Sequence, residues 1–504
     1  MNRAIRRVSL ACLIMFVALL VMVNYVQGFE ASSLANKPGN GRTFAQQFQY
    51  QRGSIITADQ KVIAASKTVK GIYKYQRYYP QGPVYAPVTG YDSLYSATGI
   101  EQAENKQLSG SDPALAVHNL IDLISGKPKK GATVQLTINS KAQQAAYSAL
   151  AAIRLPNGLH AQAGLVAINP QSGAILALAS YPTFDPNAYA TLDGTQLNKI
   201  DNQYRHEASQ PLLNRAINDT FPPGSTFKIV TGSTAFSTGK YNTGTNVYAP
   251  TNLNLPGTSK QLINYDNEAC NNGSNNSGNG KVPLIYAFTI SCNTVFGNLG
   301  MKLGGSAIQR QANKFGMNNS GLTIPLPVSP SNYPTVSDKA LTAYSAIGQY
   351  NDTVTPLQEA MFAAAIANNG VLMKPYLVQK VTAPDLTTLS TTQQSVLSRA
   401  VSPTVASEVK KMMINVTSQP YGTAHLSAGT AATGGIVVAA KTGTAQNGIN
   451  NVGLDDAVFT SFAPASNPQI AVGVVVKGGG LGADASAPIA VKVIKAYLAA
   501  QGKS

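Results

Sequence analysis

A serine and a lysine with the spacing of a catalytic pair, Ser225 and Lys228, follow a Pro-Pro-Gly turn. If a helix begins at this turn, the i,i+3 spacing places the hydroxyl and the amine on one face, within reach of each other. Serine needs a base beside it to be a nucleophile, and lysine is such a base only where its surroundings lower its pKa. The apolar neighbours Phe227, Ile229 and Val230 could provide those surroundings. The pair therefore predicts nucleophilic catalysis, and the alternative is a serine that caps a helix.

The Ser-x-x-Lys pattern occurs twice more, and we interpret both matches as chance. Ser237 and Lys240 flank a glycine at the expected end of the helix that the first serine opens. Ser407 and Lys410 lie within a predicted helix, on a face that a glutamate between them marks as solvated. The pattern by itself is thus weak evidence, and the weight of the first pair depends on residues further along the chain.

Two later stretches carry polar groups that suit the same site. Ser291 and Asn293 follow a polar loop at residues 267–280 and present a hydroxyl and an amide at a segment end. The strand at residues 436–445 ends in Lys441-Thr442-Gly443-Thr444, where the lysine offers charge to a carboxylate and the glycine leaves space for a ligand backbone. Either stretch alone is weak, since other Ser-x-Asn triplets occur in the loop and a strand can end in an ordinary turn.

Length and composition indicate a globular protein of more than one domain. Its 504 residues are 44% hydrophobic and 12% charged, which is enough apolar material for two or more domains. The net charge of +16 favours an anionic partner, such as a lipid surface or an anionic polymer. Nucleic acid is the least supported partner, because no basic run with interleaved aromatic residues is present. Four scattered histidines without a metal-binding motif predict neither a metal nor a cofactor.

The N-terminus predicts a membrane anchor. Arg3, Arg6 and Arg7 precede an apolar run from Val8 to Val23, which is about long enough to cross a bilayer with the N-terminus in the cytoplasm. A cleaved signal peptide is the alternative. We favour an uncleaved anchor, because the apolar run is long and no small-x-small cleavage site follows it directly. The rest of the chain is then exported from a single-pass anchor in the cytoplasmic membrane.

Cys270 and Cys292 are the two cysteines outside the apolar N-terminal run. In an oxidising compartment they could pair, and closing this loop would stabilise the fold by about 3 kcal/mol. Two free thiols are the alternative, and the sequence leaves the choice open.

Hydrophobic periodicity predicts a β-rich first part and a mixed second part, with a break near residues 154–158. The first part is expected to contain short strands on either side of a turn at 58–60, a helix at 101–108, a strand at 133–138 and a helix at 140–153. The second part is expected to contain strands 163–170 and 173–179, helices 341–349, 356–369 and 403–416, strands 436–445, 458–464 and 470–476, and a closing helix 488–500.

The order of the motifs resembles that of a known enzyme family. Ser-x-x-Lys, then Ser-x-Asn, then Lys-Thr-Gly, is the set found in penicillin-binding proteins and class A β-lactamases. The stretches 52–55, 164–181, 214–216 and 343–358 resemble class B penicillin-binding proteins, so the likeness covers nearly the whole chain. No glycosyltransferase segment lies between the anchor and the β-rich part, which fits class B rather than class A. The chain is most similar to the short, actinobacterial-type members.

The resemblance implies an α+β fold in three parts. Residues 1–28 would form a cytoplasmic tail and a transmembrane signal-anchor, and residues 29–155 a β-rich, non-catalytic pedestal or dimerisation-type domain. Residues 156–504 would form the transpeptidase, or penicillin-binding, domain, with a central antiparallel sheet flanked by helices.

The resemblance also implies an activity: D,D-transpeptidation, which cross-links peptidoglycan stem peptides through an acyl-enzyme that β-lactams trap. Ser225 would attack the carbonyl of the D-Ala-D-Ala bond, and Lys228 would be the general base. Ser291 would relay a proton to the leaving amine, and Lys441 would maintain the electrostatic and proton network.

The other motif residues would bind the substrate. Asn293 would bind its amide, Thr442 and Thr444 its terminal carboxylate, and Gly443 would allow its close approach. Backbone N–H groups of Ser225 and Thr444 would form an oxyanion hole, which is often worth roughly 3 kcal/mol per donor. A polytopic glycan polymerase of the division or elongation machinery would be a partner, and we expect the pedestal to contact it. The sequence does not distinguish division from elongation.

The chain departs from the family pattern in two places. Tyr350 stands where family members often have glycine after Gln349. Tryptophan is absent, so the aromatic residue often found on the strand after Lys-Thr-Gly would come from Phe459 or Phe462.

Two alternative functions remain at this stage. A D,D-carboxypeptidase or β-lactamase would use the same serine, but needs a water-activating carboxylate that the sequence does not identify. A scaffold of the division or elongation machinery, or a β-lactam sensor, could keep the motifs by descent, although a sensor usually has several membrane spans or a cytoplasmic domain.

Overall fold

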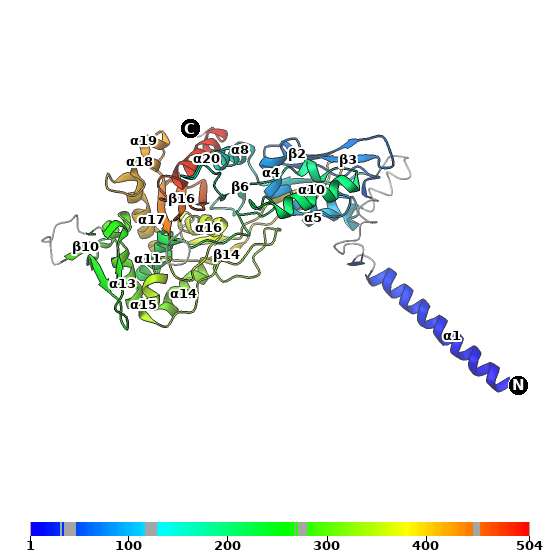
Figure 1. Ribbon diagram of the computed structural model, residues 1–504, viewed down its shortest axis with the longest axis horizontal. Helices are drawn as coiled ribbons and strands as arrows, with labels where there is room; N and C mark the ends of the chain where they lie inside the picture. Colours follow the sequence, from blue (N-terminus) through cyan, green and yellow to red (C-terminus); the bar gives the residue numbers. More distant parts are fainter. Residues whose placement is uncertain are drawn as a thin grey trace.

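The computed structural model describes residues 2–30, 33–34, 47–115, 129–267, 269–270, 280–446 and 454–502. The molecule is elongated, and helix α1 (Asn2–Tyr25), continued by η1 (Val26–Glu30), projects from one end (Figure 1). The side chains of residues 5–25 are exposed, and the segment Ile5–Glu30 is apolar and long enough to cross a membrane. A helix therefore stands where the sequence predicts the anchor.

A six-stranded sheet forms the part of the molecule next to α1. Its strand order is β13-β12-β4-β1-β2-β3, and β4 pairs with β1 in parallel and with β12 antiparallel. The strands are β1 (Ile55–Ile56), β2 (Val62–Thr68), β3 (Tyr75–Tyr78), β4 (Thr133–Leu136), β12 (Val378–Thr382) and β13 (Thr388–Thr391). The predicted strands on either side of the turn at 58–60 and at 133–138 are confirmed within a few residues.

A buried ionic cluster stabilises this sheet. Glu101 accepts hydrogen bonds from Arg52 Nε and Arg77 Nε, each at 2.6 Å, and all three side chains are buried. Arg77 also donates to Gly53 O at 2.7 Å. Burial of one carboxylate between two guanidinium groups satisfies charges that would otherwise be costly, so the cluster joins β1, β3 and helix α5 (Gly99–Ala103).

A five-stranded antiparallel sheet forms the centre of the second part, in the order β15-β16-β17-β5-β6. Its strands are β5 (Ala163–Ile168), β6 (Ile175–Tyr181), β15 (Ala439–Ala445), β16 (Asp456–Ala463) and β17 (Ile470–Val476). Every residue of β5, β16 and β17 is buried, because helices cover both faces. The helices are α16 (Pro356–Ala367) on one face, and α8 (Ser140–Ala151) and α20 (Ser486–Ala500) on the other.

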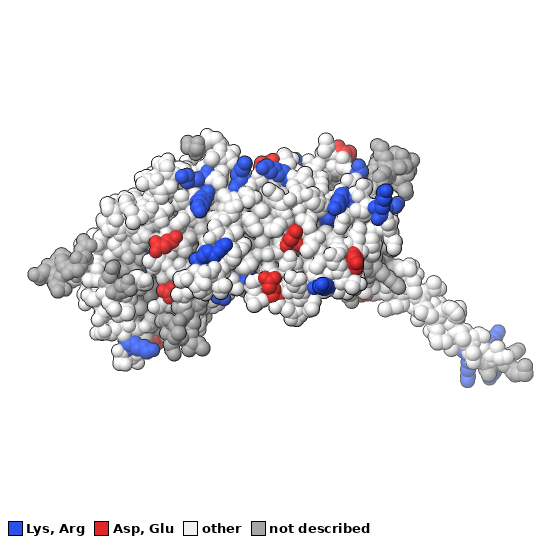
Figure 2. Space-filling view, turned by 45° about the horizontal axis from the view of Figure 1, so that its top comes forward, with Lys and Arg blue, Asp and Glu red and all other residues white. Residues whose placement is uncertain are grey.

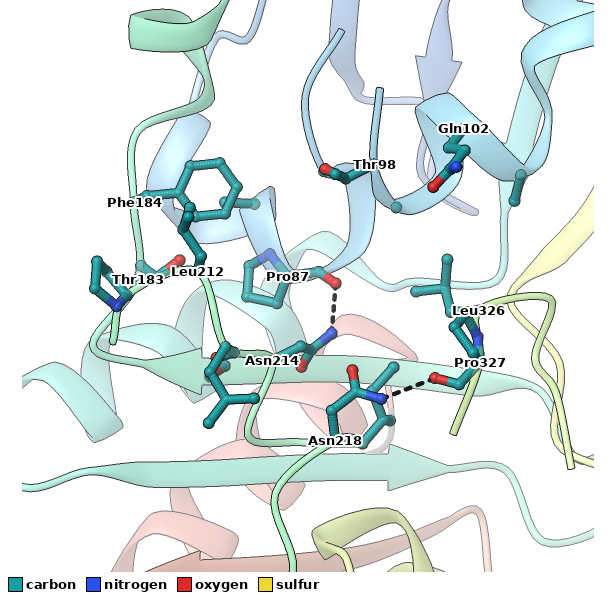
Figure 3. Close-up of a pocket in the computed structure, with 18 of the residues that line it drawn as sticks. Pro87, Thr98, Gln102, Thr183, Phe184, Leu212, Asn214, Asn218, Leu326 and Pro327 are labelled. Atoms are coloured by element: carbon teal, nitrogen blue, oxygen red, sulfur yellow. Dashed lines mark hydrogen bonds between the residues drawn. The ribbon is translucent and has the colours of Figure 1, made fainter. Parts of the chain in front are cut away.

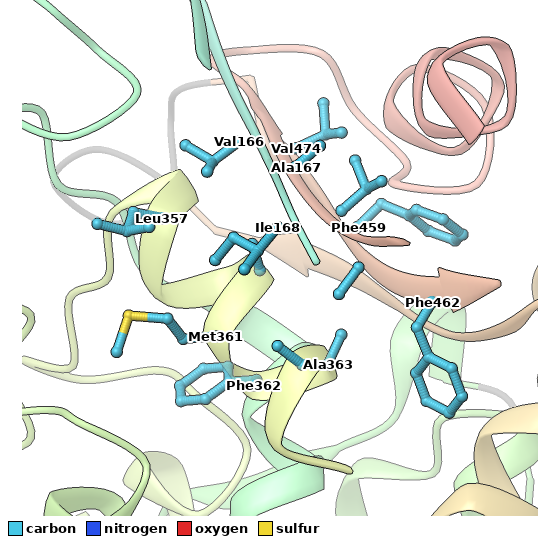
Figure 4. Close-up of a cluster of buried hydrophobic side chains, with 14 of the residues drawn as sticks. Val166, Ala167, Ile168, Leu357, Met361, Phe362, Ala363, Phe459, Phe462 and Val474 are labelled. Atoms are coloured by element: carbon cyan, nitrogen blue, oxygen red, sulfur yellow. The ribbon is translucent and has the colours of Figure 1, made fainter. Parts of the chain in front are cut away.

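Helix α16 is the centre of the core. All its residues are buried, and Leu357, Met361 and Phe362 lie within the apolar cluster that Figure 4 shows against the strands. The helix can approach the sheet because β17 has a glycine there. A Cβ added to Gly473 would lie 2.4 Å from both Ala360 N and Pro356 O.

Local capping explains where several helices begin. Asn139 caps α8 by accepting from the N–H groups of Lys141 and Ala142. Ser402 caps α17 (Pro403–Ser418) by accepting from Val405 N. These contacts are typical of N-cap residues, and the predicted starts of both helices are confirmed.

The other elements connect or cover these layers. They are α4 (Gly82–Thr89), α6 (Asn105–Leu108), η2 (Pro113–Leu115), α9 (Pro186–Tyr189), α10 (Gly194–His206), η3 (Gly224–Phe227), α11 (Lys228–Ser237), β7 (Asn246–Tyr248), β8 (Asn252–Asn254), β9 (Gln261–Ile263), η4 (Tyr265–Asn267), β10 (Lys281–Pro283), α12 (Leu284–Thr289), α13 (Asn293–Leu303), α14 (Gly305–Lys314), α15 (Lys339–Ser345), β11 (Val371–Met373), β14 (Val396–Arg399), α18 (His425–Ala428) and α19 (Thr430–Thr433).

The two parts of the molecule are interlocked rather than consecutive. Strands β12 and β13 come from the second half of the chain but extend the sheet next to the anchor. Helix α8 precedes residue 155 but packs on β6 and α20. Tyr189 stacks on Tyr91 with ring centroids 3.9 Å apart, in a second small core. The boundary between residues 155 and 156 therefore stays a prediction, because side chains and strands cross it in both directions.

We predict that Gly473→Ala destabilises the protein by about 1–3 kcal/mol, because the added methyl group meets backbone atoms that cannot move aside. The measurement is the free energy of unfolding of the full-length protein in detergent. Gly321→Ala is the matched control: Gly321 is exposed, and its added Cβ would meet one atom at 3.6 Å. Equal stability of the two variants would contradict the tight packing of α16 on β17.

Candidate active site

Ser225 lies on the 3-10 turn η3, and Lys228 begins helix α11. Gly224 opens the turn with φ +54°, a conformation that favours glycine, and its N–H donates to Gly348 O at 2.9 Å. A Cβ on Gly348 would lie 2.0 Å from Gly224 O. The expected helix start is therefore a 3-10 turn followed by an α-helix, and Ser225 caps neither element with its side chain.

The structure brings Ser225, Lys228, Ser291, Asn293 and Lys441 together. Lys228 Nζ lies 2.9 Å from Ser225 Oγ, 2.7 Å from Ser291 O, 2.7 Å from Asn293 Oδ1 and 3.3 Å from Ser291 Oγ. Lys441 Nζ lies 2.9 Å from Ser291 Oγ and 2.9 Å from Thr442 O. The Ser291 hydroxyl thus lies between two amines, and the first of these contacts the Ser225 hydroxyl.

The contacts of Lys228 specify where a proton can go. Two of its close neighbours, Ser291 O and Asn293 Oδ1, are carbonyl oxygens and can only accept. A neutral amine has two N–H donors for these oxygens and one lone pair. That lone pair is then left for the Ser225 hydroxyl, which makes Lys228 a base for Ser225.

Burial favours the neutral form of both amines. Lys228 is fully buried, and burial, together with the charge of Lys441, holds its pKa well below the ordinary value of 10.5. Burial also lowers the pKa of Lys441 to about 7. The apolar surroundings are the rings of Phe296, 5.7 Å from Lys228 Nζ, and Phe288, 5.5 Å from Lys441 Nζ.

Part of the apolar setting of Lys228 comes from outside its own segment of the chain, and the contribution expected of its neighbours Ile229 and Val230 stays a prediction. Phe227 stacks on Tyr333, with ring centroids 5.2 Å apart, and belongs to the core beside α16. The ring next to the amine comes instead from α13, more than sixty residues later in the chain. No local pattern around Lys228 could have identified it.

Ser291 and Asn293 lie at the junction of α12 and α13. Ser291 has φ +63°, a strained conformation for a residue with a side chain, and this directs its carbonyl and hydroxyl to Lys228. Asn264 Oδ1 accepts from the N–H groups of Asn293 and Thr294 and so caps α13. The sequence analysis missed Asn264, because it lies far from Asn293 along the chain.

Strand β15 forms one wall of the site. Thr442 and Thr444 line the cleft, and Thr442 Oγ1 lies 2.7 Å from Thr423 Oγ1, a hydroxyl that the sequence analysis missed. Glycine at position 443 has a packing role. A Cβ there would lie 2.8 Å from Pro223 O, so that Gly443 allows the turn η3 to approach the strand. The close approach of a ligand backbone at Gly443 stays a prediction.

The site opens into a cleft of about 680 Å³. Ser225, Ser291 and Asn293 line it, and a disulfide between Cys270 and Cys292 lies at its edge. The pairing that the sequence left open is thus present in the structure. It places a cross-link inside the Ser-x-Asn motif.

The two departures from the family pattern have structural answers. Tyr350 adopts φ +82°, the conformation that a glycine would take at this position, and remains partly exposed. Such a conformation costs about 1–3 kcal/mol for a residue with a side chain. Phe459 and Phe462 are fully buried in the core shown in Figure 4 and are not among the described residues that line the cleft. The expectation that one of them supplies the aromatic residue of the site stays a prediction.

A second cavity, of about 540 Å³, lies between the two parts of the molecule (Figure 3). Asn214 donates to Pro87 O and Asn218 donates to Pro327 O beside it. Its walls in the described chain carry no Lys, Arg, His, Asp or Glu, which leaves it without an acid, a base or an ion partner.

Charges are spread over the surface. Figure 2 shows basic and acidic side chains interspersed over the face that it presents, with basic side chains at the far end of α1. The net charge of +16 thus forms no single basic patch on this face.

Comparisons with known proteins match nearly the whole chain. Residues 163–495 match the family model of the penicillin binding protein transpeptidase domain, and residues 52–134 match that of the penicillin binding protein A dimerisation domain. The peptidoglycan D,D-transpeptidase PbpA of Mycolicibacterium smegmatis is 38% identical over 510 residues, which cover 99% of each chain. Its namesake from Mycobacterium tuberculosis is 37% identical over 507 residues, again 99% of each chain.

Solved structures agree with these relatives. The crystal structure of PBPA from Mycobacterium tuberculosis superposes with a TM-score of 0.83 at 36% identity, and covers 90% of this chain and 100% of its own. The ceftriaxone acyl-enzyme complex of the same protein gives a TM-score of 0.82 at 35% identity with the same coverage.

We predict that Lys441→Met changes how stability depends on pH. From pH 7 to 10.5 the unfolded wild type holds a proton that folded Lys441 has released, so stability rises with pH across this window. Below about pH 7 the full cost of the buried charge is present. As the pH increases from 7 to 10.5, the unfolding midpoint of the wild type should therefore rise relative to that of Lys441→Met. Parallel pH profiles would contradict the lowered pKa.

Proposed function

Because the chain belongs to the class B penicillin-binding proteins, we propose that Ser225 is the residue on which its acyl-enzyme forms. The protein is a peptidoglycan D,D-transpeptidase, which acts on stem peptides and reacts with β-lactams. The observation that supports Ser225 is the placement of Lys228 Nζ, 2.9 Å from Ser225 Oγ and 2.7 Å from each of two carbonyl oxygens.

The acylation step follows from these contacts. Ser225 Oγ attacks the carbonyl carbon of the D-Ala-D-Ala bond while the lone pair of Lys228 takes its proton. When the C–N bond breaks, the leaving D-Ala amine takes a proton through the Ser291 hydroxyl, which contacts both Lys228 and Lys441. The products are an ester on Ser225 and free D-Ala.

Deacylation completes the cross-link. The amine of a second stem peptide attacks the ester carbon and gives up a proton, which Lys228 takes. The C–O bond to Ser225 then breaks, and Ser225 Oγ recovers this proton from Lys228. A new amide bond then joins the two peptides. A β-lactam enters by the same attack, but its leaving nitrogen stays tethered in the opened ring, which keeps the site blocked.

Substrate binding is assigned to the residues around the nucleophile. Thr442 and Thr444 would hold the terminal carboxylate, beside the amine of Lys441, which contacts Thr442 O. Asn293, whose Oδ1 contacts Lys228, would present its amide to the peptide. Backbone N–H groups of Ser225 and Thr444 would stabilise the oxyanion. Gly443 would act indirectly, by letting η3 pack against β15.

Hydrolysis is the second candidate function. It needs a carboxylate that activates water, and Asp455 is the acidic residue that lines the cleft among those described. Glu359 is fully buried and out of contact with solvent, which makes it unsuited to activate water. The transpeptidase assignment is favoured over a hydrolase because the relatives that match nearly the whole chain are peptidoglycan D,D-transpeptidases.

We expect Ser225→Ala to abolish labelling by a fluorescent penicillin, because the variant lacks the oxygen that forms the ester. The full-length protein would be labelled in detergent, and the modified peptide identified by mass spectrometry. Ser237→Ala, which removes the serine of the second Ser-x-x-Lys pattern, should label like the wild type. Labelling of Ser225→Ala, or an adduct on another residue, would refute the assignment. Turnover of β-lactam in the same sample would indicate a hydrolase.

The finer points of location and partnership remain proposals. The helix α1 would be a single-pass anchor with its N-terminus in the cytoplasm and the catalytic part outside, and the parts would divide at 1–28, 29–155 and 156–504. The pedestal would contact a polytopic glycan polymerase. Supporting this contact, Ile72 at the tip between β2 and β3 is 86% exposed.

Ile72→Asp is predicted to weaken co-purification with the glycan polymerase of the same organism from solubilised membranes, because a charge would replace an exposed apolar contact. Leu386→Asp is the matched control. Leu386 is 83% exposed at the turn between β12 and β13 of the same sheet, at its opposite edge. Unchanged co-purification with Ile72→Asp, or an equal loss with Leu386→Asp, would exclude this contact.

A further inference from the structure

A buried glutamate that the catalytic steps do not use lies directly below the nucleophile. Glu359 is the one acidic residue of helix α16, and its side chain is fully buried. Its Oε1 lies 2.8 Å from the hydroxyl of Thr226, the residue after Ser225. Its other oxygen, Oε2, is buried without a hydrogen-bond partner among the described residues. A carboxyl group in such a place needs an explanation, since burying an ionised carboxylate without a cation is costly.

The position of Glu359 is held from both sides. Thr460 Oγ1 of β16 donates to Glu359 O at 2.5 Å. A Cβ on Gly473 of β17 would lie 2.7 Å from Glu359 Cβ, so the helix and the strand are already in close contact. The carboxyl group is therefore directed at η3 by the packing of α16 on the sheet.

The hydrogen-bond count at Thr226 indicates the protonation state of the acid. Thr226 Oγ1 lies 2.8 Å from Glu359 Oε1 and also 2.8 Å from Pro223 O. A threonine hydroxyl has one proton to donate, and the carbonyl of Pro223 can only accept. Both contacts are satisfied when a protonated Glu359 donates to Thr226, and Thr226 donates to Pro223.

We propose that Glu359 is a positioning residue for the nucleophile: as a neutral acid it donates to Thr226, which in turn donates to Pro223 O and holds the turn that presents Ser225. The turn has little room to adjust, because Gly443 and Gly348 pack against its backbone. Loss of the Glu359 proton would make the carboxylate an acceptor. Thr226 would then donate to Glu359, and Pro223 O would lose its hydrogen bond.

The charge state of Glu359 suits this role at neutral pH. Burial raises its pKa to about 8, against an opposing effect of the Thr226 hydrogen bond. The acid is thus neutral at pH 7 and ionises above about pH 8. At neutral pH, Glu359 should donate to Thr226 and Thr226 should donate to Pro223 O. In mild alkali the hydrogen bond to Pro223 O should be lost.

The ionisable groups on the elements around α16 are engaged elsewhere. Strands β5, β11 and β17 and the turn η3 carry no acidic or basic side chain. In β16, Asp456 accepts from Gly478 N at the far end of the strand. In α17, Lys411 pairs with Glu408 at 2.6 Å, and Lys410 lies over the ring of Phe462.

The catalytic lysines are the titrating groups nearest to η3. Lys228 follows the turn directly, and Lys441 lies on β15, which packs against it. Both have a lowered pKa, so they produce a rise of activity with pH rather than a fall. Burial also raises the pKa of Asp352, which lies on the loop before α16 and accepts a hydrogen bond from Ser345 at the end of α15. An alkaline loss of activity therefore belongs to Glu359 only where Glu359→Gln removes it.

The test is the rate of acylation by a fluorescent penicillin as a function of pH, with the full-length protein in detergent. The wild-type rate should rise as the lysines lose protons and fall again above about pH 8. Glu359→Gln keeps a donor to Thr226 but cannot ionise. It should retain the rise and lose the fall, with a rate within about threefold of wild type at neutral pH.

Glu359→Leu removes the donor at every pH and should lower the rate by roughly tenfold throughout, because the turn is no longer held in place. The thermal unfolding of each protein at each pH separates this effect from loss of structure. If Glu359→Leu does not fold, the comparison of wild type with Glu359→Gln decides the question alone. The proposal is overturned if the same alkaline fall appears in Glu359→Gln, if the wild type shows no fall, or if folded Glu359→Leu reacts at the wild-type rate.

Discussion

The removal of two lysine amines from water is the constraint on which the rest of the structure depends. Lys228 and Lys441 are both fully buried, and a charged ammonium group in such a place is costly unless it releases its proton. The site offers no carboxylate to either amine in the described part of the chain, only hydroxyl and carbonyl oxygens. Burial therefore favours the neutral amine, which can accept a proton at neutral pH. A serine nucleophile requires such a base beside it.

The fold meets this constraint by packing elements unusually close to the nucleophile. Helix α16 lies under the sheet where Gly473 permits it, and strand β15 meets the turn η3 where Gly443 permits it. The loop before α16 contributes Gly348, whose carbonyl holds the N–H of Gly224. Since these contacts involve backbone atoms, the position of Ser225 depends on the whole core and not on its own helix alone.

The same core also connects the site to the end of the molecule that carries α1. Strand β4 pairs with β12, which comes from the catalytic half of the chain, and leads into helix α8, which packs against the central sheet. Backbone hydrogen bonds and a shared apolar core thus join the two parts. A transpeptidase that reaches its substrate at a given distance from the membrane gains from such a connection, because the height of the cleft is then determined by the sheet rather than by a linker.

The sequence by itself determined the elements and the chemistry of the motifs. Runs rich in apolar and small residues are enough to place β5, β16 and β17, since strands buried on both faces need such residues nearly throughout. Capping residues such as Asn139 and Ser402 mark the helix starts, and a long apolar run marks α1. The motif order indicated the family, because each side-chain type has one plausible role in that chemistry.

Only the tertiary structure decided how these parts meet. It placed Phe296 against Lys228, Asn264 on the end of α13, and β12 beside β4, and these contacts join segments far apart in the chain. It also showed that Gly443 has a packing role, beside the turn η3. Local sequence patterns indicate which secondary structure a residue favours. These contacts depend instead on which residues from distant parts of the chain pack beside it. For that reason the nucleophile could be predicted from the sequence, and the buried acid below it could not.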